Sequence, residues 1–213
     1  MIPPLVLGQI APGGHVRLAA NMANASIVCE VAPSRFTGPV ADLAARLAAA
    51  LGLEVRILPF ASGGAILAGA GTWDVAVLAV DPARSQIRYV HEVARVSATL
   101  AGREDDMATC CSGADRPGVR IATARGAAYE SHLLGNLAHA EVVPFETPAA
   151  ARDAMLTGIC DFAAGIRATL EDSLAHHPGI RLMRDDFLTV SQALAVPTEH
   201  GETAVFLGKI LDS

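Results

Sequence analysis

The chain has 213 residues, of which 52% are hydrophobic and only 4% aromatic, so its core must be aliphatic and can fill one domain or two small lobes. The net charge of −6, with no basic stripe to offset it, argues against nucleic acid as a partner. No run of about eighteen apolar residues is present, which argues against a membrane-spanning helix.

The first part of the chain predicts a β-α-β unit. His15–Asn21 alternates weakly between apolar and polar residues, and Glu54–Pro59 is predicted as the next strand. Between them a helix begins at Gly38-Pro39 and ends at Gly52. Its apolar residues recur on one face: Val40, Leu43, Ala44, Leu47 and Leu51. Such a unit implies a right-handed crossover and a parallel sheet.

A continuous apolar run, Val75 to Val80, follows a short predicted helix at 65–70 and ends abruptly at Asp81-Pro82. A short, β-branched run between turn signals is typical of a strand buried on both faces. Arg84 lies just past its carboxyl end, where ligands bind in open α/β sheets. A guanidinium there suits a carboxylate, because its fork of donors matches two oxygens at once.

The second part repeats this order after an extended segment at 89–101 and a polar loop at 102–118. The predicted strands are Val119–Ala124, Glu141–Phe145, Asp161–Gly165, Arg181–Met183 and Ser191–Val196. The predicted helices are 128–137, 148–158, 167–176 and 203–211.

A short motif recurs in the two halves, Gly71-Thr72-Trp73-Asp74 and Gly158-Ile159-Cys160-Asp161. Each copy follows a helix and precedes a buried strand, which indicates two similar lobes. We expect both aspartates to position the start of a strand and not to act as chemical acids. We place lobe 1 at 1–95 plus 191–213 and lobe 2 at 96–190, with crossover strands near 96–100 and 191–196.

The four cysteines show no metal-binding spacing. Cys110 and Cys111 are adjacent and are not expected to bridge each other, while Cys29 and Cys160 are expected in apolar surroundings. We therefore expect free or structural thiols, no metal and no cofactor.

The N-terminal segment 1–14 has no basic region, and its apolar patch is short for a signal peptide. The chain is therefore expected either to stay in the cytoplasm or to have an export signal upstream.

The order of these motifs resembles the family 3 extracellular solute-binding proteins, the amino-acid receptors of ABC importers. Gly38-Pro-Val-Ala-Asp-Leu-Ala is similar to their Gly-Phe-x-x-Asp-Leu-Ala helix start, and the two Gly-x-x-Asp copies to their two Gly-x-x-Asp blocks. Val119 to Tyr129 is similar to their Val-Gly-Val…Gly-Thr-Thr-Tyr segment. The resemblance runs from about Val16 to Val196.

This resemblance implies an α/β, two-lobed type 2 periplasmic-binding-protein fold. Each lobe would have a mainly parallel sheet flanked by helices, with a ligand cleft between the lobes. It also implies an ABC permease as partner and a periplasmic location.

The resemblance also implies a binding site. The arginine that matches Arg84 binds the ligand carboxylate, and backbone N–H groups near the matches of Gly126 and Ala127 bind the same anion. Residues near the matches of Asn24 and Phe60 line the pocket. The predicted ligand-binding residues are Asn24, Phe60, Val80, Arg84, Arg125, Gly126, Ala127 and Arg167. No catalytic residue is predicted.

Two departures from the family pattern concern the ligand. The acid that binds an α-amino group is missing near Ile166, where Arg167 stands instead, and the aromatic residue expected near Asn24 is also missing. Together with Arg84 and Arg125, this favours a small anion, either a carboxylate without an amine or one with two acidic groups.

Two other functions stay open. One is an enzyme on the same fold, similar to cyclohexadienyl dehydratases, with Glu130 or Glu171 as general acid. The other is a cytoplasmic small-molecule sensor domain that acts through a protein partner.

Overall fold

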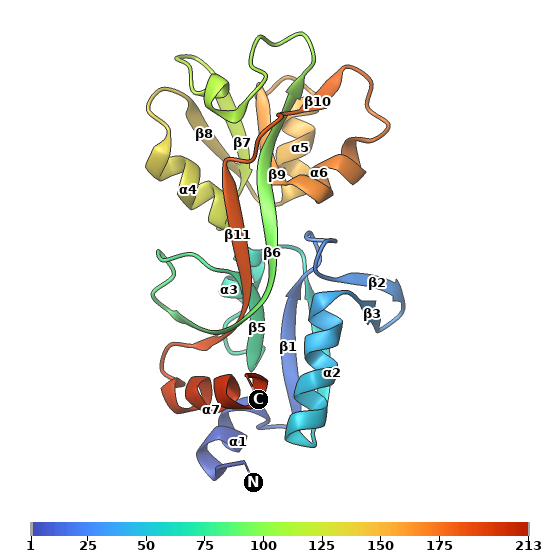
Figure 1. Cartoon of the computed structure of the whole chain (residues 1–213), viewed down its shortest axis with the longest axis vertical. Helices are drawn as coiled ribbons and strands as arrows, with labels where there is room; N and C mark the ends of the chain where they lie inside the picture. The colour runs from blue at the N-terminus through green and yellow to red at the C-terminus, as the bar shows by residue number, and fades with distance from the viewer. Residues whose placement is uncertain (1, 213) are drawn as a thin grey trace. The chain divides into compact units, whose positions relative to one another are not determined.

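The computed structural model describes residues 2–212, and its contacts divide the chain into two compact units (Figure 1). Unit 1 comprises Met1–Met22, Ser26–Arg95 and Ser191–Ser213, and unit 2 comprises Ala23–Ala25 and Val96–Val190. Two long strands, β6 (Ile87–Arg103) and β11 (Leu188–Pro197), contribute residues to both units. None of the helices within residues 2–212 has the length and apolar character that crossing a bilayer requires.

Unit 1 is a β-α-β-α-β series completed by β11. Its strands lie in the order β4-β1-β5-β11, where β1 is parallel to β4 and β5, and β11 is antiparallel to β5. The elements of this series are β1 (His15–Asn21), α2 (Pro39–Leu51), β4 (Glu54–Phe60), α3 (Gly63–Ala68) and β5 (Val75–Ala79). The predicted parallel β-α-β unit is therefore confirmed.

Helix α2 forms where the apolar spacing predicts it. Pro39 stands in its first turn, and the five predicted apolar residues are those that the helix buries. Gly52 ends it in the left-handed conformation, with φ 65° and its N–H bonded to the Ala48 carbonyl, as a C-terminal glycine commonly does.

Unit 2 has the corresponding order, β8-β7-β9-β6, with β7 parallel to β8 and β9, and β6 antiparallel to β9. Its elements are η1 (Cys111–Ala114), β7 (Arg120–Ala124), α4 (Ala128–Asn136), β8 (Glu141–Phe145), α5 (Pro148–Leu156), β9 (Phe162–Ile166), α6 (Arg167–Leu174) and β10 (Ile180–Leu182). Strand β10 pairs with β6. The predicted α/β class, with mainly parallel sheets, is confirmed.

Each unit has an aliphatic core of its own. In unit 1, Ile66, Trp73 and Leu78 belong to a buried cluster under α3, and the Trp73 indole donates a 2.8 Å hydrogen bond to the Ile66 carbonyl. In unit 2, Met155 and Leu170 belong to a buried cluster around β9, α5 and α6.

The two Gly-x-x-Asp motifs tie neighbouring strands together in the same way. In unit 1, the Asp74 N–H donates to the Arg17 carbonyl (3.0 Å) and the Arg17 N–H donates to the Asp74 carboxylate (2.8 Å). In unit 2, Asp161 and Arg120 exchange the same pair of bonds, at 2.9 and 2.7 Å. Both aspartates thus join the strand that they precede to the central strand of the unit, as expected.

Four elements were not predicted from the sequence. They are helix α1 (Pro4–Ile10), which packs against α7 (Gly201–Leu211), the β2–β3 hairpin (Cys29–Ala32 and Arg35–Thr37), and the short η1 inside the predicted loop. Cys29, expected among apolar neighbours, is exposed on β2, which corrects that expectation. All four cysteines are free thiols.

Candidate functional site

The Arg84 side chain is buried in unit 1, with 6% of its surface exposed. It lies after β5, at the carboxyl end of a parallel strand, as the sequence predicts. Its Nη1 donates a 2.7 Å hydrogen bond to the Ala79 carbonyl, and its Nε lies 3.7 Å from the Asp81 carboxylate. A buried guanidinium needs such partners, because an uncompensated buried charge is strongly destabilising.

Two residues that sequence reasoning missed hold this arginine in place. Asp81 also accepts the Ala83 N–H at 2.9 Å, which fixes the turn that leads to Arg84. The Tyr89 hydroxyl donates to the Ala79 carbonyl at 2.9 Å and accepts the Asp81 N–H at 3.1 Å. Asp81 could have been identified from the sequence, because it lies three residues before the arginine. Tyr89 could not, because its hydrogen bonds to Ala79 and Asp81 depend on the fold.

The loop before α3 lies beside Arg84. A Cβ placed on Gly63 would lie 3.9 Å from Arg84 Nη2, an ordinary contact distance, so the backbone of this loop lies near the guanidinium. Ser62 is buried and caps α3 by accepting the Ala65 N–H at 3.1 Å. Arg84, its two supports and this loop make up the Arg84 cluster, all within unit 1.

Phe60 ends strand β4 and Val80 follows strand β5, and β1 lies between these two strands in the sheet. Phe60 packs against the core cluster under α3, and a Cβ on Gly69 would lie only 2.9 Å from its ring. Val80 is 39% exposed, and its N–H donates to the Ser191 carbonyl at 2.7 Å. Phe60 therefore has a packing role, and a ligand contact by either residue stays a prediction.

In unit 2, the backbone N–H groups predicted to bind an anion lie just before α4, and one of them is bonded to a carboxylate of the chain itself. The Gly126 N–H donates a 2.6 Å hydrogen bond to Oε2 of Glu130, which is 9% exposed, and the Ala127 N–H donates to the Ala124 carbonyl. A carboxylate at a helix N-terminus is favourable, because the backbone N–H groups and the helix dipole attract it. Next to it, burial raises the pKa of the Tyr129 phenol well above its usual range, so Tyr129 is neutral.

The two predicted arginines of unit 2 are both paired within that unit. Arg125 is exposed and lies 3.1 Å from Glu146. Arg167 donates to the Asp186 carboxylate at 2.6 Å, to the Thr99 hydroxyl at 3.1 Å and to the carbonyls of Met183 and Asp185 at 3.0 and 2.9 Å. Arg167 therefore ties the start of α6 to the segment that follows β10.

Asn24 is assigned to unit 2 by its contacts and is 3% exposed. Within the described residues, its side-chain oxygen has no hydrogen-bond partner. Such an atom is costly to bury, so a polar group that reaches Asn24 would be stabilised there.

Neither a protein-family model nor a curated relative matches the sequence. Solved structures do match. The amino acid ABC transporter substrate-binding protein AbpA from Streptococcus pneumoniae, bound to L-arginine, has TM-score 0.76 at 17% identity, covering 95% of this chain and 90% of its own. The periplasmic VFT2 domain of Bordetella pertussis BvgS has TM-score 0.79 at 21% identity, covering 100% and 93%.

A third match is AncCDT-1, an ancestral amino acid-binding protein described as a precursor of cyclohexadienyl dehydratase. Its TM-score is 0.75 at 20% identity, covering 97% of this chain and 92% of its own. At these identities the similarity establishes the fold. The chain has the type 2 periplasmic-binding fold, also called a Venus flytrap, as the sequence predicts.

Proposed function

We propose that this chain, which has the fold of the type 2 periplasmic-binding proteins, is a solute-binding protein for a small carboxylate without an amine. The fold supports a binding role, since AbpA is an amino acid ABC transporter substrate-binding protein bound to L-arginine. We further propose that the chain serves an ABC-type importer and works in the periplasm or outside the cell.

The observation that carries this proposal is the buried guanidinium of Arg84. Ala79 and Asp81 hold it in one orientation at the carboxyl end of β5. A side chain that is already fixed loses little conformational entropy when it binds, so a carboxylate that meets it gains most of the ionic hydrogen-bond energy.

The pairing of charges in unit 2 favours one acidic group on the ligand over two. Arg125 and Arg167 already have carboxylate partners inside unit 2, and Glu130 places a negative charge at Gly126. A second acidic group on the ligand would have to displace one of these carboxylates, which lie 3.1 Å from Arg125 and 2.6 Å from Arg167, closer than the 3.7 Å between Arg84 and Asp81. We therefore favour a monocarboxylate, with Arg84 as its main contact.

A second candidate is a small-molecule sensor domain that acts through a protein partner. The same fold occurs as one domain of a longer protein in the periplasmic VFT2 domain of BvgS, with a TM-score of 0.79. For the dehydratase reading, Glu130 is engaged by the Gly126 N–H, and the Glu171 side chain is 56% exposed next to Arg167. Each carboxyl group thus already has a partner inside unit 2, and this arrangement gives the dehydratase reading no support.

A thermal-shift screen tests the proposal. The protein would be mixed with monocarboxylates, keto acids, dicarboxylates, aromatic acids and amino acids. A ligand at a hundred times its Kd stabilises the folded state by roughly 2.7 kcal/mol, which raises the Tm by about 5–10 °C. We expect monocarboxylates to give this shift and the amino acid with the same side chain to give less.

Two variants make the screen specific to Arg84. Arg84→Lys keeps the charge but loses the planar fork, so the shift should fall although the protein still folds. Arg88→Lys, on an exposed arginine of the same unit, should keep the full shift. A shift with amino acids alone, or an unchanged shift in Arg84→Lys, would contradict the proposed ligand class.

A further inference from the structure

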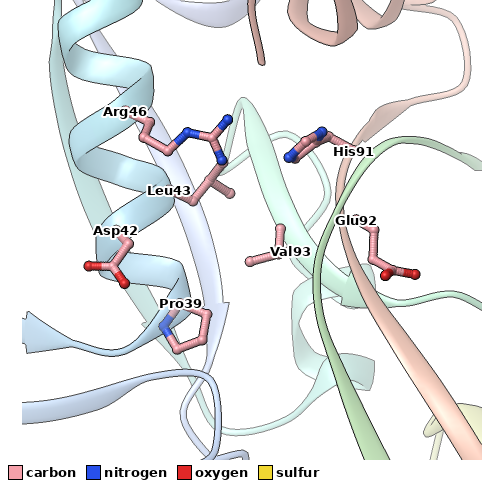
Figure 2. A pocket seen from close by; sticks show the side chains of 7 residues that line it. All are labelled: Pro39, Asp42, Leu43, Arg46, His91, Glu92 and Val93. Carbon is pink, nitrogen blue, oxygen red and sulfur yellow. The ribbon is translucent and has the colours of Figure 1, made fainter. Parts of the chain in front are cut away.

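Unit 1 has a surface pocket of about 240 Å³ between helix α2 and strand β6, here called the α2–β6 pocket (Figure 2). It is separate from the Arg84 cluster, with which it shares no residue. Its lining residues are Pro39, Asp42, Leu43, Arg46, His91, Glu92 and Val93. A volume of this size holds several water molecules or one small organic acid.

One end of the pocket is made by two nitrogen-bearing side chains. Figure 2 shows the guanidinium of Arg46 and the imidazole of His91 pointing toward one another, from α2 and from β6, with Leu43 and Val93 below them. Arg46 Nη2 donates to the Leu211 carbonyl at 2.7 Å. Within residues 2–212, Nε and Nη1 of Arg46 have no hydrogen-bond partner.

The chain itself shows which group this end of the pocket accepts. His91 Nδ1 lies 2.9 Å from a carboxylate oxygen of Asp212, whose side chain is 70% exposed. The Asp212 carboxylate is mostly exposed and pairs with His91, so a carboxylate from solution could take its place and also reach Arg46.

The two acidic residues of the lining do not block that end. In Figure 2 the carboxylates of Asp42 and Glu92 point away from the space between Arg46 and His91. Glu92 is also engaged elsewhere, by the Arg95 guanidinium at 2.9 Å and the Ser191 hydroxyl at 2.8 Å. Besides Arg46, His91 and these two acidic residues, the pocket is lined by the apolar side chains of Leu43, Val93 and Pro39.

We propose that the α2–β6 pocket is a second binding site, which takes a small carboxylic acid with a short aliphatic chain. The carboxylate would bind between Arg46 and His91 in place of Asp212, and the chain would lie on Leu43, Val93 and Pro39. This site does not depend on Arg84 or on the proposed transport role.

Titration with hexanoate, followed by NMR of the methyl groups, tests the site. Signals of Leu43 and Val93 should shift with a saturable dependence on hexanoate. Leu78, whose methyl group lies near Gly63 and Arg84, reports separately on the Arg84 cluster. Failure of one site is therefore distinguishable from failure of the other.

Four variants sharpen the test. Arg46→Gln and His91→Gln should each weaken hexanoate binding about tenfold, the value expected for one charged hydrogen bond. Asp212→Asn should strengthen hexanoate binding several-fold, because it removes the carboxylate that competes for His91. If Arg46, His91 and Asp212 had only a structural role, this substitution would not increase the affinity. Arg88→Gln is the matched exposed arginine and should leave binding unchanged.

Three results would overturn the site: no shift at Leu43 and Val93, the same shift with hexylamine, or equal affinity in wild type, Arg46→Gln and Asp212→Asn. The two-dimensional spectrum of each variant would show directly whether it is folded. Because Arg46 is exposed on α2, its replacement should not disturb the core.

Discussion

Asp74 and Asp161 hold the same position in the two units but differ in burial. Asp74 is 3% exposed and also binds the Arg17 guanidinium, at 2.6 and 3.1 Å. Asp161 is exposed, and its carboxylate accepts the Arg120 N–H alone. One sequence motif thus makes a buried connection in unit 1 and an exposed one in unit 2.

This difference predicts unequal costs for the same substitution. Asp74→Ala should lower the free energy of unfolding by about 2–3 kcal/mol, because a buried N–H and a guanidinium lose their partner. Asp161→Ala should cost about 0.5–1.5 kcal/mol, since water replaces the lost bond. Urea unfolding followed by circular dichroism measures both, and equal costs would show that burial does not decide the strength of this connection.

Asp115 predicts an acid sensitivity of unit 2. Its carboxylate accepts the N–H groups of Ala138, Ala140 and His139 at 2.8–2.9 Å, and these bonds hold the pKa of Asp115 below its usual value. A lowered pKa contributes stability that is present above about pH 4 and is lost as the pH falls through the folded-state pKa.

The comparison is between wild type and Asp115→Asn, which cannot titrate at this position. The wild type should have the higher Tm at pH 7, and the difference should shrink towards pH 3. A constant difference across this range would mean that the charge of Asp115 contributes nothing. Asp172→Asn, on an exposed aspartate, is the control.

Residue types could be predicted from the sequence, but their partners could not. The position of Arg84 after a buried strand followed from the strand pattern. That Arg167 would bind Thr99, 68 positions earlier, did not, because nothing local in the sequence encodes such a pairing. The predicted anion-binding site thus included Arg125 and Arg167, whose side chains pair with other segments of unit 2.

The two glycines that bound helix α2 have different reasons to be glycine. Gly38 has φ 98°, and a Cβ there would lie 2.9 Å from the Ile27 carbonyl oxygen, which accepts the Val40 N–H. Gly52 has φ 65°, and a Cβ there would meet no atom within 4 Å.

Alanine substitutions at Gly38 and Gly52 separate the cost of a positive φ from the cost of a steric clash. Gly52→Ala should cost about 1–2 kcal/mol, the backbone cost of the left-handed conformation alone. Gly38→Ala should cost more, about 2–4 kcal/mol, because the backbone around Ile27 must also move. Thermal unfolding of the two variants checks the order, and a smaller loss for Gly38→Ala would contradict it.

Helix α2 was predictable because of its buried face, whereas the exposed β2 strand was not. Helix α2 buries five apolar residues at helical spacing, and this spacing is visible in the sequence. The β2 strand of the hairpin is exposed along its whole length, and the turn uses Ser34 at φ 58° where glycine would have signalled it. An exposed hairpin thus gives neither an alternating pattern nor a turn signal.

At the scale of the whole molecule, the four free thiols lie in different surroundings. Cys29, in unit 1, is exposed. In unit 2, Cys110 is half-buried, and Cys111 and Cys160 are buried. Burial raises the pKa of Cys111 to about 11 and also raises that of Cys160, so both are protonated and unreactive near pH 7.5.

Alkylation of the two buried thiols should therefore report on the opening of unit 2, with the exposed Cys29 as an internal reference. At pH 7.5, iodoacetamide should modify Cys29 quickly, while Cys111 and Cys160 should react slowly and at one common rate set by the opening of unit 2. Peptide mass spectrometry measures each rate, and urea-unfolded protein provides the fully reactive reference. Rapid modification of Cys160 in the native protein would contradict its burial.

The fold was predictable because the same order of elements occurs twice, and two weak signals support one another. Each unit places its strands in the corresponding order, and the antiparallel strand comes from β11 in unit 1 and from β6 in unit 2. The ligand was not predictable to the same degree, since it depends on side chains such as Glu130 whose partners only the fold reveals.

The place of β11 in unit 1 bears on how the nascent chain folds. Apart from Ala23–Ala25, unit 2 is one continuous segment, Val96–Val190, whereas unit 1 needs Gln192–Ala195 to pair with β5. The ribosome therefore releases nearly all of unit 2 before it releases the strand that completes unit 1. Until then the edge of β5 has open backbone hydrogen-bonding groups, and the part of the protein that is made first is the last to be finished.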